Sequence, residues 1–322
     1  MIASETITVA HSPDSDDAFM FYALAEGRVD TEGLAFLHEL SDIESLNRRA
    51  MAGELAVTAV SFHAYAHLAD RYLLLPHGAS FGDGYGPVVV ASDAAREGVV
   101  ARNAAREGVV ARNATREGVA ARNAADEGVA RDAHEEITRE AIESGRVTVA
   151  SPGRWTTAEL ALRLWARGAK TRPMPFDLIQ AAVASGEADA GLLIHEGQLT
   201  FREEGLREVV DLGRWWKQET GLPLPLGGNV VRRDLGPDRI ARISRALSRS
   251  IEYGLAHREA ALDHAMRYAR GLDRARADRF VGMYVNAWTR GYGEAGRLAV
   301  QTLLDSGHRA GLLPPVRAEY AP

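Results

Sequence analysis

The chain has 322 residues, 46% of them hydrophobic and 25% charged, enough for two medium-sized hydrophobic cores. It contains no cysteine, which excludes disulfides, thiolate metal sites, cysteine nucleophiles and a lipoprotein anchor. The formal net charge is −6, and the basic residues are almost all arginines scattered among acids, so the sequence does not indicate a nucleic-acid partner. No export signal is recognisable, and no apolar run approaches the ~18 residues that a membrane span needs. We therefore expect a cytoplasmic protein without a membrane partner; composition leaves both monomer and homodimer open.

The first third alternates short apolar runs with helical patterns. Strands are expected over residues 7–11, 34–39, 56–60 and 72–75. The helix after the first strand opens at Ser12-Pro13, carries three aspartates in its first turn and closes at Gly27. The sequence Ser41-Asp-Ile-Glu44 predicts a capping box for a helix that runs to Ala52.

The same β-α-β-α-β order returns after a long interruption. Strands are expected over residues 147–150, 171–175 and 190–194, with helices over 156–167 and 176–185, and residues 208–212 echo the strand at 72–75. The repeated pattern predicts an α/β protein of two similar lobes with its site in the cleft between them. We divide the chain into a first lobe (1–91, completed by 227–322), an insertion (92–135) and a second lobe (136–226).

The last third is helical. Apolar residues recur at helical spacing over residues 238–256, 258–270, 273–290 and 293–308, and these helices are expected to pack on the first lobe. Tyr284, Asn286 and Trp288 are candidates for a ligand pocket, although aromatic residues on such helices commonly belong to the core.

The interruption contains a repeated ten-residue unit. From residue 94 to residue 132 the chain reads AAREGVVARN, AAREGVVARN, ATREGVAARN and AADEGVARD. Ten steps of about 100° rotate an apolar stripe by roughly 80°, so the repeat does not keep one helical face in register. We interpret it as a low-complexity, partly helical surface insertion without a part in the chemistry; the alternative is a solenoid whose units share one core.

Polar residues follow the predicted strands where ligands of open α/β sheets bind. His195 stands at the end of residues 190–194, Ser61 ends the third strand, and Ser12 follows the first. Thr156 and Thr157 open a helix, and unpaired amides at such a start suit a carboxylate. A neutral imidazole facing that anion is able to remove a proton from a bound substrate, although a lone histidine is commonly a capping or core residue.

The acids near Ser12 argue against an anion at the first helix, so Thr156 and Thr157 are the preferred carboxylate anchor. Asp17 is a candidate for orienting a hydroxyl or a partner histidine.

Several other functional motifs are absent or incomplete in this sequence. The glycines at 82, 84 and 86 precede a strand instead of opening a helix, so the dinucleotide fingerprint is absent, as is a Walker loop. His63 and His67 are four residues apart, but no third ligand stands at a zinc spacing, and we predict no metal site. Ser61 lacks the context of a nucleophile elbow, which argues against a hydrolase.

Segments along nearly the whole chain outside the repeat resemble the 1,4-dihydroxy-6-naphthoate synthases of the futalosine route to menaquinone. They are SPDSDDAFMFYAL (12–24), TAVSFHAYA (58–66), GYGPVVVA (84–91), PGRWTTAEL (152–160), AGLLIHE (190–196) and LGRWWKQETGLPLPLGGNVVRRDLG (212–236). The chain departs from the pattern Ser-Pro-Cys-Pro-Asn-Asp-Thr-Phe of many relatives, since Asp16 replaces an amide and Ala18 a hydroxyl.

The resemblance implies a two-lobed periplasmic-binding-protein-like type II fold without a transport role. It implies a lyase that acts on cyclic dehypoxanthine futalosine and uses no metal or organic cofactor. By motif, His195 would be the base, Thr156 and Thr157 would hold the substrate carboxylate, and Ser61 and Asp17 would bind the rest. The alternatives are a solute-binding protein for an anionic or aromatic small molecule and the related chorismate dehydratase, whose pattern explains the IHE and GLPLPLG segments less well.

Overall fold

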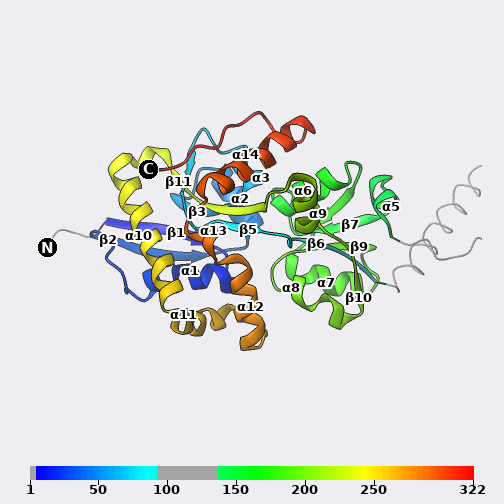
Figure 1. Cartoon of the computed structure of the whole chain (residues 1–322), viewed down its shortest axis with the longest axis horizontal. Helices are drawn as coiled ribbons and strands as arrows, with labels where there is room; N and C mark the ends of the chain where they lie inside the picture. The colour runs from blue at the N-terminus through cyan, green and yellow to red at the C-terminus, as the bar shows by residue number, and fades with distance from the viewer. Residues whose placement is uncertain (1–4, 93–136) are drawn as a thin grey trace, which may run out of the picture.

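Two β-sheets form two lobes that lie side by side (Figure 1). The computed structural model describes residues 5–92 and 137–322, so the repeat predicted at 94–132 lies outside the described residues. The strands of the first sheet lie in the order β2 (Leu34–Leu40), β1 (Glu5–His11), β3 (Val57–Ser61), β11 (Leu224–Arg232) and β4 (Tyr72–Leu74), and β5 (Ser80–Gly82) also pairs with β11. β1 is parallel to β2 and β3, whereas β11 is antiparallel to its three partners.

The second sheet takes one strand from before the repeat. Its order is β10 (Leu206–Asp211), β6 (Val88–Ser92), β9 (Ala190–Leu193), β7 (Thr148–Ser151) and β8 (Lys170–Pro173). The expected boundary at residue 91 is therefore wrong by one strand. The apolar run Val88–Ser92 is buried and pairs with β9 and β10, so it belongs to the second lobe, and the chain crosses between the lobes just before it and again before β11.

Helices cover both sheets. The helices of the first lobe are α1 (Ser15–Ala25), α2 (Ile43–Met51), α3 (Phe62–Tyr65), α10 (Pro237–Ala256), α11 (Arg258–Ala265), α12 (Arg274–Tyr284), α13 (Ala287–Arg290) and α14 (Gly293–Arg309). Those of the second lobe are α5 (Arg139–Glu143), α6 (Thr157–Trp165), α7 (Phe176–Ala184), α8 (Gly197–Thr200) and α9 (Leu212–Thr220). α10, α11 and α12 all pack on α1, which confirms that the C-terminal helices complete the first lobe. No helix of the described residues is both long enough and apolar enough to span a membrane.

Two helix boundaries differ from the predictions because other side chains cap the helices. Asp42, not Ser41, caps α2 by accepting the backbone N–H of Ser45, and the Glu44 carboxylate accepts the N–H of Trp155 in the second lobe at 3.0 Å. The helix expected over 273–290 breaks after Tyr284. Asn286 starts α13 with its own capping box.

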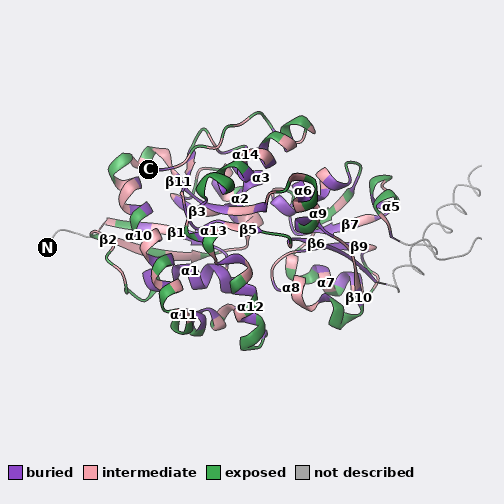
Figure 2. Cartoon of the chain, in the orientation of Figure 1, coloured by how far each residue is buried: buried purple, intermediate pink, exposed green. Residues whose placement is uncertain are grey.

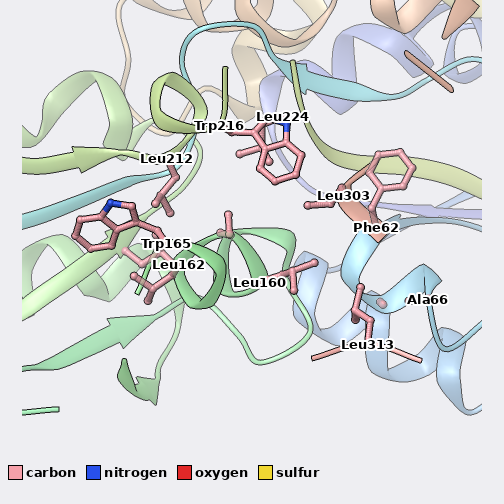
Figure 3. Packing of buried hydrophobic residues seen from close by; sticks show 14 of the residues in the cluster. Phe62, Ala66, Leu160, Leu162, Trp165, Leu212, Trp216, Leu224, Leu303 and Leu313 are labelled. Carbon is pink, nitrogen blue, oxygen red and sulfur yellow. The ribbon is translucent and has the colours of Figure 1, made fainter. Parts of the chain in front are cut away.

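One hydrophobic cluster continues from the first lobe into the second. It includes Leu160 and Trp165 of α6, Trp216 of α9, Leu224 of β11 and Phe62 of α3 (Figure 3). Figure 2, which colours each residue by its burial, shows that α1, β6 and β9 consist largely of buried residues. The side of the molecule where the chain crosses between the lobes is therefore held by shared apolar packing as well as by the backbone.

The crossing also brings two backbone segments close together. A Cβ atom added at Gly213, in the first turn of α9, would lie 1.9 Å from the Tyr85 carbonyl oxygen. Because no real Cβ makes such a contact, residue 213 must be glycine for the two segments to meet here.

Candidate active site

A cleft between the lobes is lined by all six residues that the sequence predicts as catalytic or substrate-binding. Including its opening to solvent it measures about 740 Å³, within the ~300–1,000 Å³ of small-molecule sites. The selected residues that line it are Ser12, Asp17, Ser61, Thr156, Thr157 and His195. Their common location confirms that they gather at one place, while the role of each stays a prediction.

The ends of four strands explain this convergence. Ser12 follows β1 and Ser61 ends β3, which is parallel to β1 in the first sheet. Thr156 follows β7 and His195 follows β9, which are parallel in the second sheet. Each lobe thus brings the carboxyl ends of two parallel strands to the cleft.

His195 stands two residues after β9 in a left-handed backbone conformation, with φ of 54°. Its side chain is 18% exposed, and Nδ1 lies 3.1 Å from Oδ2 of Asp14 across the cleft. The Phe176 ring packs against the imidazole in a T-shaped arrangement, with centroids 4.8 Å apart. A left-handed histidine costs roughly 1–3 kcal/mol of backbone strain, and here it places the ring at the wall of the cleft instead of in the core.

The start of α6 is the best anion site of the cleft. The Thr156 hydroxyl is occupied by the cap, because it accepts the Glu159 N–H and donates to the Gly153 carbonyl at 2.8 Å. The Thr157 hydroxyl accepts the His63 N–H at 3.2 Å. The backbone amides of Thr157 and Ala158 have no partner within the helix, and both residues line the cleft, so these amides are the donors that an anion would meet.

Ser61 is held from behind by Asn47 of α2. The Asn47 side chain accepts the Ser61 N–H at 2.9 Å and donates to its Oγ at 3.1 Å. Asn47 also donates to the Trp155 carbonyl of the second lobe at 3.3 Å. Because Asn47 donates to the Ser61 oxygen, the hydroxyl hydrogen is directed elsewhere and is free to meet a ligand.

The first-lobe wall of the cleft is acidic. Oδ2 of Asp17 accepts both the N–H and the hydroxyl of Ser12, at 2.7 and 2.9 Å. Burial raises the pKa of Asp17 to about 6 although these hydrogen bonds oppose the shift. Burial, reinforced by the charges of Asp17, Asp14 and Glu196, also raises the pKa of Asp16 well above its ordinary value. The shift at Asp16 favours a protonated carboxyl, which is able to donate a hydrogen bond to a ligand, whereas a pKa of about 6 leaves Asp17 largely ionised at neutral pH.

Several contributors were not selected from the sequence. Asn47 contacts Ser61, Asp14 contacts His195 and Arg270 contacts Asp14, while Gln198 lines the cleft with its amide oxygen 2.6 Å from the Tyr284 hydroxyl. Tyr284 was one of three pocket candidates; of the other two, Asn286 caps α13 and Trp288 packs on Phe81. No local pattern marks Asn47, because its partner Ser61 is 14 residues away and its third contact is in the other lobe.

His63 belongs to the joint between the lobes. Its Nδ1 lies 3.1 Å from the Thr156 carbonyl oxygen, and its ring packs near Trp155. Burial lowers the pKa of His63 to about 4, so the ring is neutral and is able to donate from Nδ1. In residues 5–92 and 137–322, no three or more His, Asp or Glu side chains are grouped so as to hold a metal.

A family model described as menaquinone biosynthesis matches residues 7–112 and 129–309. The chain belongs to the menaquinone-biosynthesis family. Two relatives, each named a 1,4-dihydroxy-6-naphthoate synthase, match along the chain. The protein of Thermus thermophilus is 37% identical over 311 residues, covering 97% of both chains. The protein of Streptomyces coelicolor is 34% identical over 322 residues, covering 97% of this chain and 96% of the relative.

Solved structures agree with the two-lobed architecture of this member of the menaquinone-biosynthesis family. A crystal structure of an Archaeoglobus fulgidus protein has a TM-score of 0.78 and 42% identity, covering 96% of this chain and 98% of that one. The alkanesulfonate-binding protein of Xanthomonas axonopodis pv. citri has a TM-score of 0.60 at 12% identity, covering 98% and 96%, and so shows the fold alone. The fold is therefore of the two-lobed, periplasmic-binding-protein-like type II, as expected.

Proposed function

We propose that this protein is a carbon–carbon lyase that converts cyclic dehypoxanthine futalosine to 1,4-dihydroxy-6-naphthoate, with His195 as the base. The observation that carries the base assignment is that His195 and the start of α6 line the same interlobe cleft. The family and its named relatives support the reaction.

The substrate carboxylate is held at the start of α6. The amides of Thr157 and Ala158 and the Thr157 hydroxyl meet it, while the positive end of the helix dipole favours its charge. The hydroxyl of Ser61 and the carboxyl of Asp17, fixed through Ser12, contact the opposite part of the molecule. This arrangement presents the reacting carbon to the second-lobe wall that carries His195.

His195 then removes a proton from the bound substrate. The electron pair left behind forms a double bond in the departing fragment as the carbon–carbon bond breaks, and the electron pair of the broken bond passes into the ring system as it becomes aromatic. A positioned base of this kind contributes about 10²- to 10⁴-fold to a rate. Closure of the lobes keeps water from the reacting atoms.

The test is the variant His195→Ala, assayed with cyclic dehypoxanthine futalosine by the absorbance of the naphthoate product. We expect turnover to fall by about 10² to 10⁴ while substrate affinity stays nearly unchanged, because the carboxylate contacts remain. His257→Ala is the matched control. His257 stacks on Tyr253 after α10 and does not line the cleft, so its loss should leave turnover intact. Near-normal turnover of His195→Ala would remove the base assignment.

The same assay addresses the solute-binding alternative. Saturable binding of the futalosine derivative by the unmodified protein, without any naphthoate formed, would replace the lyase by a binding function. The cleft would serve both functions, so only the appearance of product decides between them.

A further inference from the structure

Asp14, the residue just before α1, contacts the side chains of His195 and Arg270. Its carboxylate is 1% exposed, with Oδ2 3.1 Å from Nδ1 of His195 and Oδ1 2.6 Å from Nη2 of Arg270. Asp14 and Arg270 belong to the first lobe, whereas His195 belongs to the second. The acid and the imidazole therefore come together only where the two lobes meet.

We propose that Asp14 is a positioning residue that holds the proton of His195 on Nδ1, so that Nε2 is the basic nitrogen offered to the substrate. A neutral imidazole carries one proton, and the partner of one nitrogen decides which of the two bears it. A carboxylate accepts only, so a ring beside it keeps N–H on that side. This inference rests on the proposed role of His195 as the base.

The surroundings restrict the ring further. The Arg270 guanidinium lies over the Phe176 ring, 4.4 Å from its centroid, and the same ring makes a T-shaped contact with His195, with centroids 4.8 Å apart. Arg270 also occupies a left-handed backbone conformation, with φ of 48°. Asp14, Arg270, Phe176 and His195 thus form a closed set of contacts across the cleft, and closure of the lobes orients the base in the same motion that excludes water.

Arg270 places a positive charge beside the buried Asp14 carboxyl. Burial raises the pKa of the neighbouring Asp16, Asp17 and Glu196, and the charge of Asp14 adds to each of these shifts. The guanidinium of Arg270, 2.6 Å from Oδ1, offsets both the burial of Asp14 and the repulsion from these neighbours. Asp14 is therefore equipped to act as a fixed acceptor.

The first test measures the tautomer of His195 directly and leaves Asp14 unchanged. In the full-length protein with the product 1,4-dihydroxy-6-naphthoate bound, nitrogen-15 NMR at pH 7.5 reports which ring nitrogen of His195 carries the proton, with the His195→Gln spectrum used for assignment. We expect the Nδ1–H form. The Nε2–H form would overturn the proposal. This readout does not depend on turnover, so it separates a failure of this inference from a failure of the proposed lyase.

The second test is kinetic and compares Asp14→Asn with Glu203→Gln. Glu203 accepts from Arg276 at 3.0 Å and so also joins the two lobes, but it does not touch His195. We expect Asp14→Asn to lower kcat by about 10- to 10³-fold with KM changed less than about 3-fold, because only the transition state needs the oriented base. Glu203→Gln should leave kcat unchanged. Equal effects of the two variants on KM alone would mean that Asp14 merely holds the lobes together, and would overturn the proposal.

Discussion

Asp16 is a buried acid on the first-lobe wall of the cleft. Its side chain is about nine-tenths buried, and Oδ1 has no hydrogen-bond partner among the described residues. The first cause of its raised pKa is burial, and the charges of three neighbouring acids add to it. A protonated Asp16 presents an O–H group, so it keeps the donor that an asparagine would supply.

Replacing Asp16 with Asn should stabilise the protein increasingly as the pH rises. Because folding raises the pKa of Asp16, the folded state holds this proton more tightly than the unfolded state does, and stability is lost as the pH climbs from the ordinary value of 3.8 through the raised one. Asn does not titrate. We expect the free energy of unfolding of Asp16→Asn, relative to the unmodified protein, to increase between pH 4 and pH 8 in urea titrations.

Asp70→Asn is the control for this titration. The Asp70 side chain is 77% exposed, so its replacement should leave the pH dependence of stability unchanged. A difference between Asp16→Asn and the unmodified protein that stays constant from pH 4 to pH 8 would show that Asp16 is not held protonated by the fold.

At the scale of residues, the sequence was most informative where chemistry coincides with a strand end. Ser61 and His195 could be selected because each follows a buried apolar run, and the start of α6 because Thr156 and Thr157 precede an amphipathic helix. Asp14 and Arg270 could not be selected together, since 256 residues separate them and only the folded chain makes them partners. The sequence predicts where the ligand binds better than it predicts what supports the groups that bind it.

At the scale of elements, α2 connects the two walls of the site. Its residue Asn47 is completely buried and bonds both to Ser61 at the end of β3 and to the Trp155 carbonyl ahead of α6. On the same helix Glu44 accepts the Trp155 N–H. One helix of the first lobe therefore supports Ser61 and fixes the approach of the anion site in the second lobe.

Asn47→Ala should weaken both stability and substrate binding. Truncation leaves the buried Ser61 N–H without its partner, which costs about 1–3 kcal/mol in the free energy of unfolding, and it frees Ser61 to turn away from the ligand, so KM should rise. Urea unfolding and steady-state kinetics measure the two effects. Ser45→Ala, on the same helix, is the control and should change neither, because the half-buried Ser45 hydroxyl accepts only from the exposed Arg48 side chain among the described contacts. Unchanged stability of Asn47→Ala would contradict the supporting role of this residue.

Elements with strong periodicity were predicted and those shaped by tertiary contacts were not. The expected strands at 7–11, 34–39 and 190–194 correspond to β1, β2 and β9 within one or two residues. β11 was missed, because its sequence LPLGGNVVR contains a proline and two glycines that argue against a strand. Gly228 is required there, since a Cβ atom would lie 2.5 Å from the Tyr292 hydroxyl and the strand packs closely on that side.

At the scale of the molecule, the two lobes touch along both sides of the cleft. Glu44, Asn47 and His63 reach the segment before α6 on one side. Asp14, Tyr284 and Arg276 reach His195, Gln198 and Glu203 on the other. These polar contacts across the cleft accompany the apolar cluster at the crossing, which suits a closed form that opens to admit substrate.

Removal of the repeat should leave the chemistry intact. Ser92 and Ile137, the described residues on either side of it, do not line the cleft. Long surface insertions add little to the cost of closing a loop, so replacing residues 94–132 with a short Gly/Ser linker should change kcat/KM by less than about 3-fold. Loss of turnover in a shortened protein that keeps its circular dichroism spectrum would instead give the repeat a part in the site.

The position of β11 in the first sheet bears on how the chain matures during synthesis. β11 lies between β3 and β4, yet it is translated only after every strand of the second sheet. A nascent chain on the ribosome therefore holds β3 and β4 with open edges until more than two-thirds of the protein has been made, while the second sheet already has all its strands. Domains usually fold in the order in which they emerge from the ribosome. In this protein the first lobe begins first, but its sheet is completed only after the second sheet has all its strands.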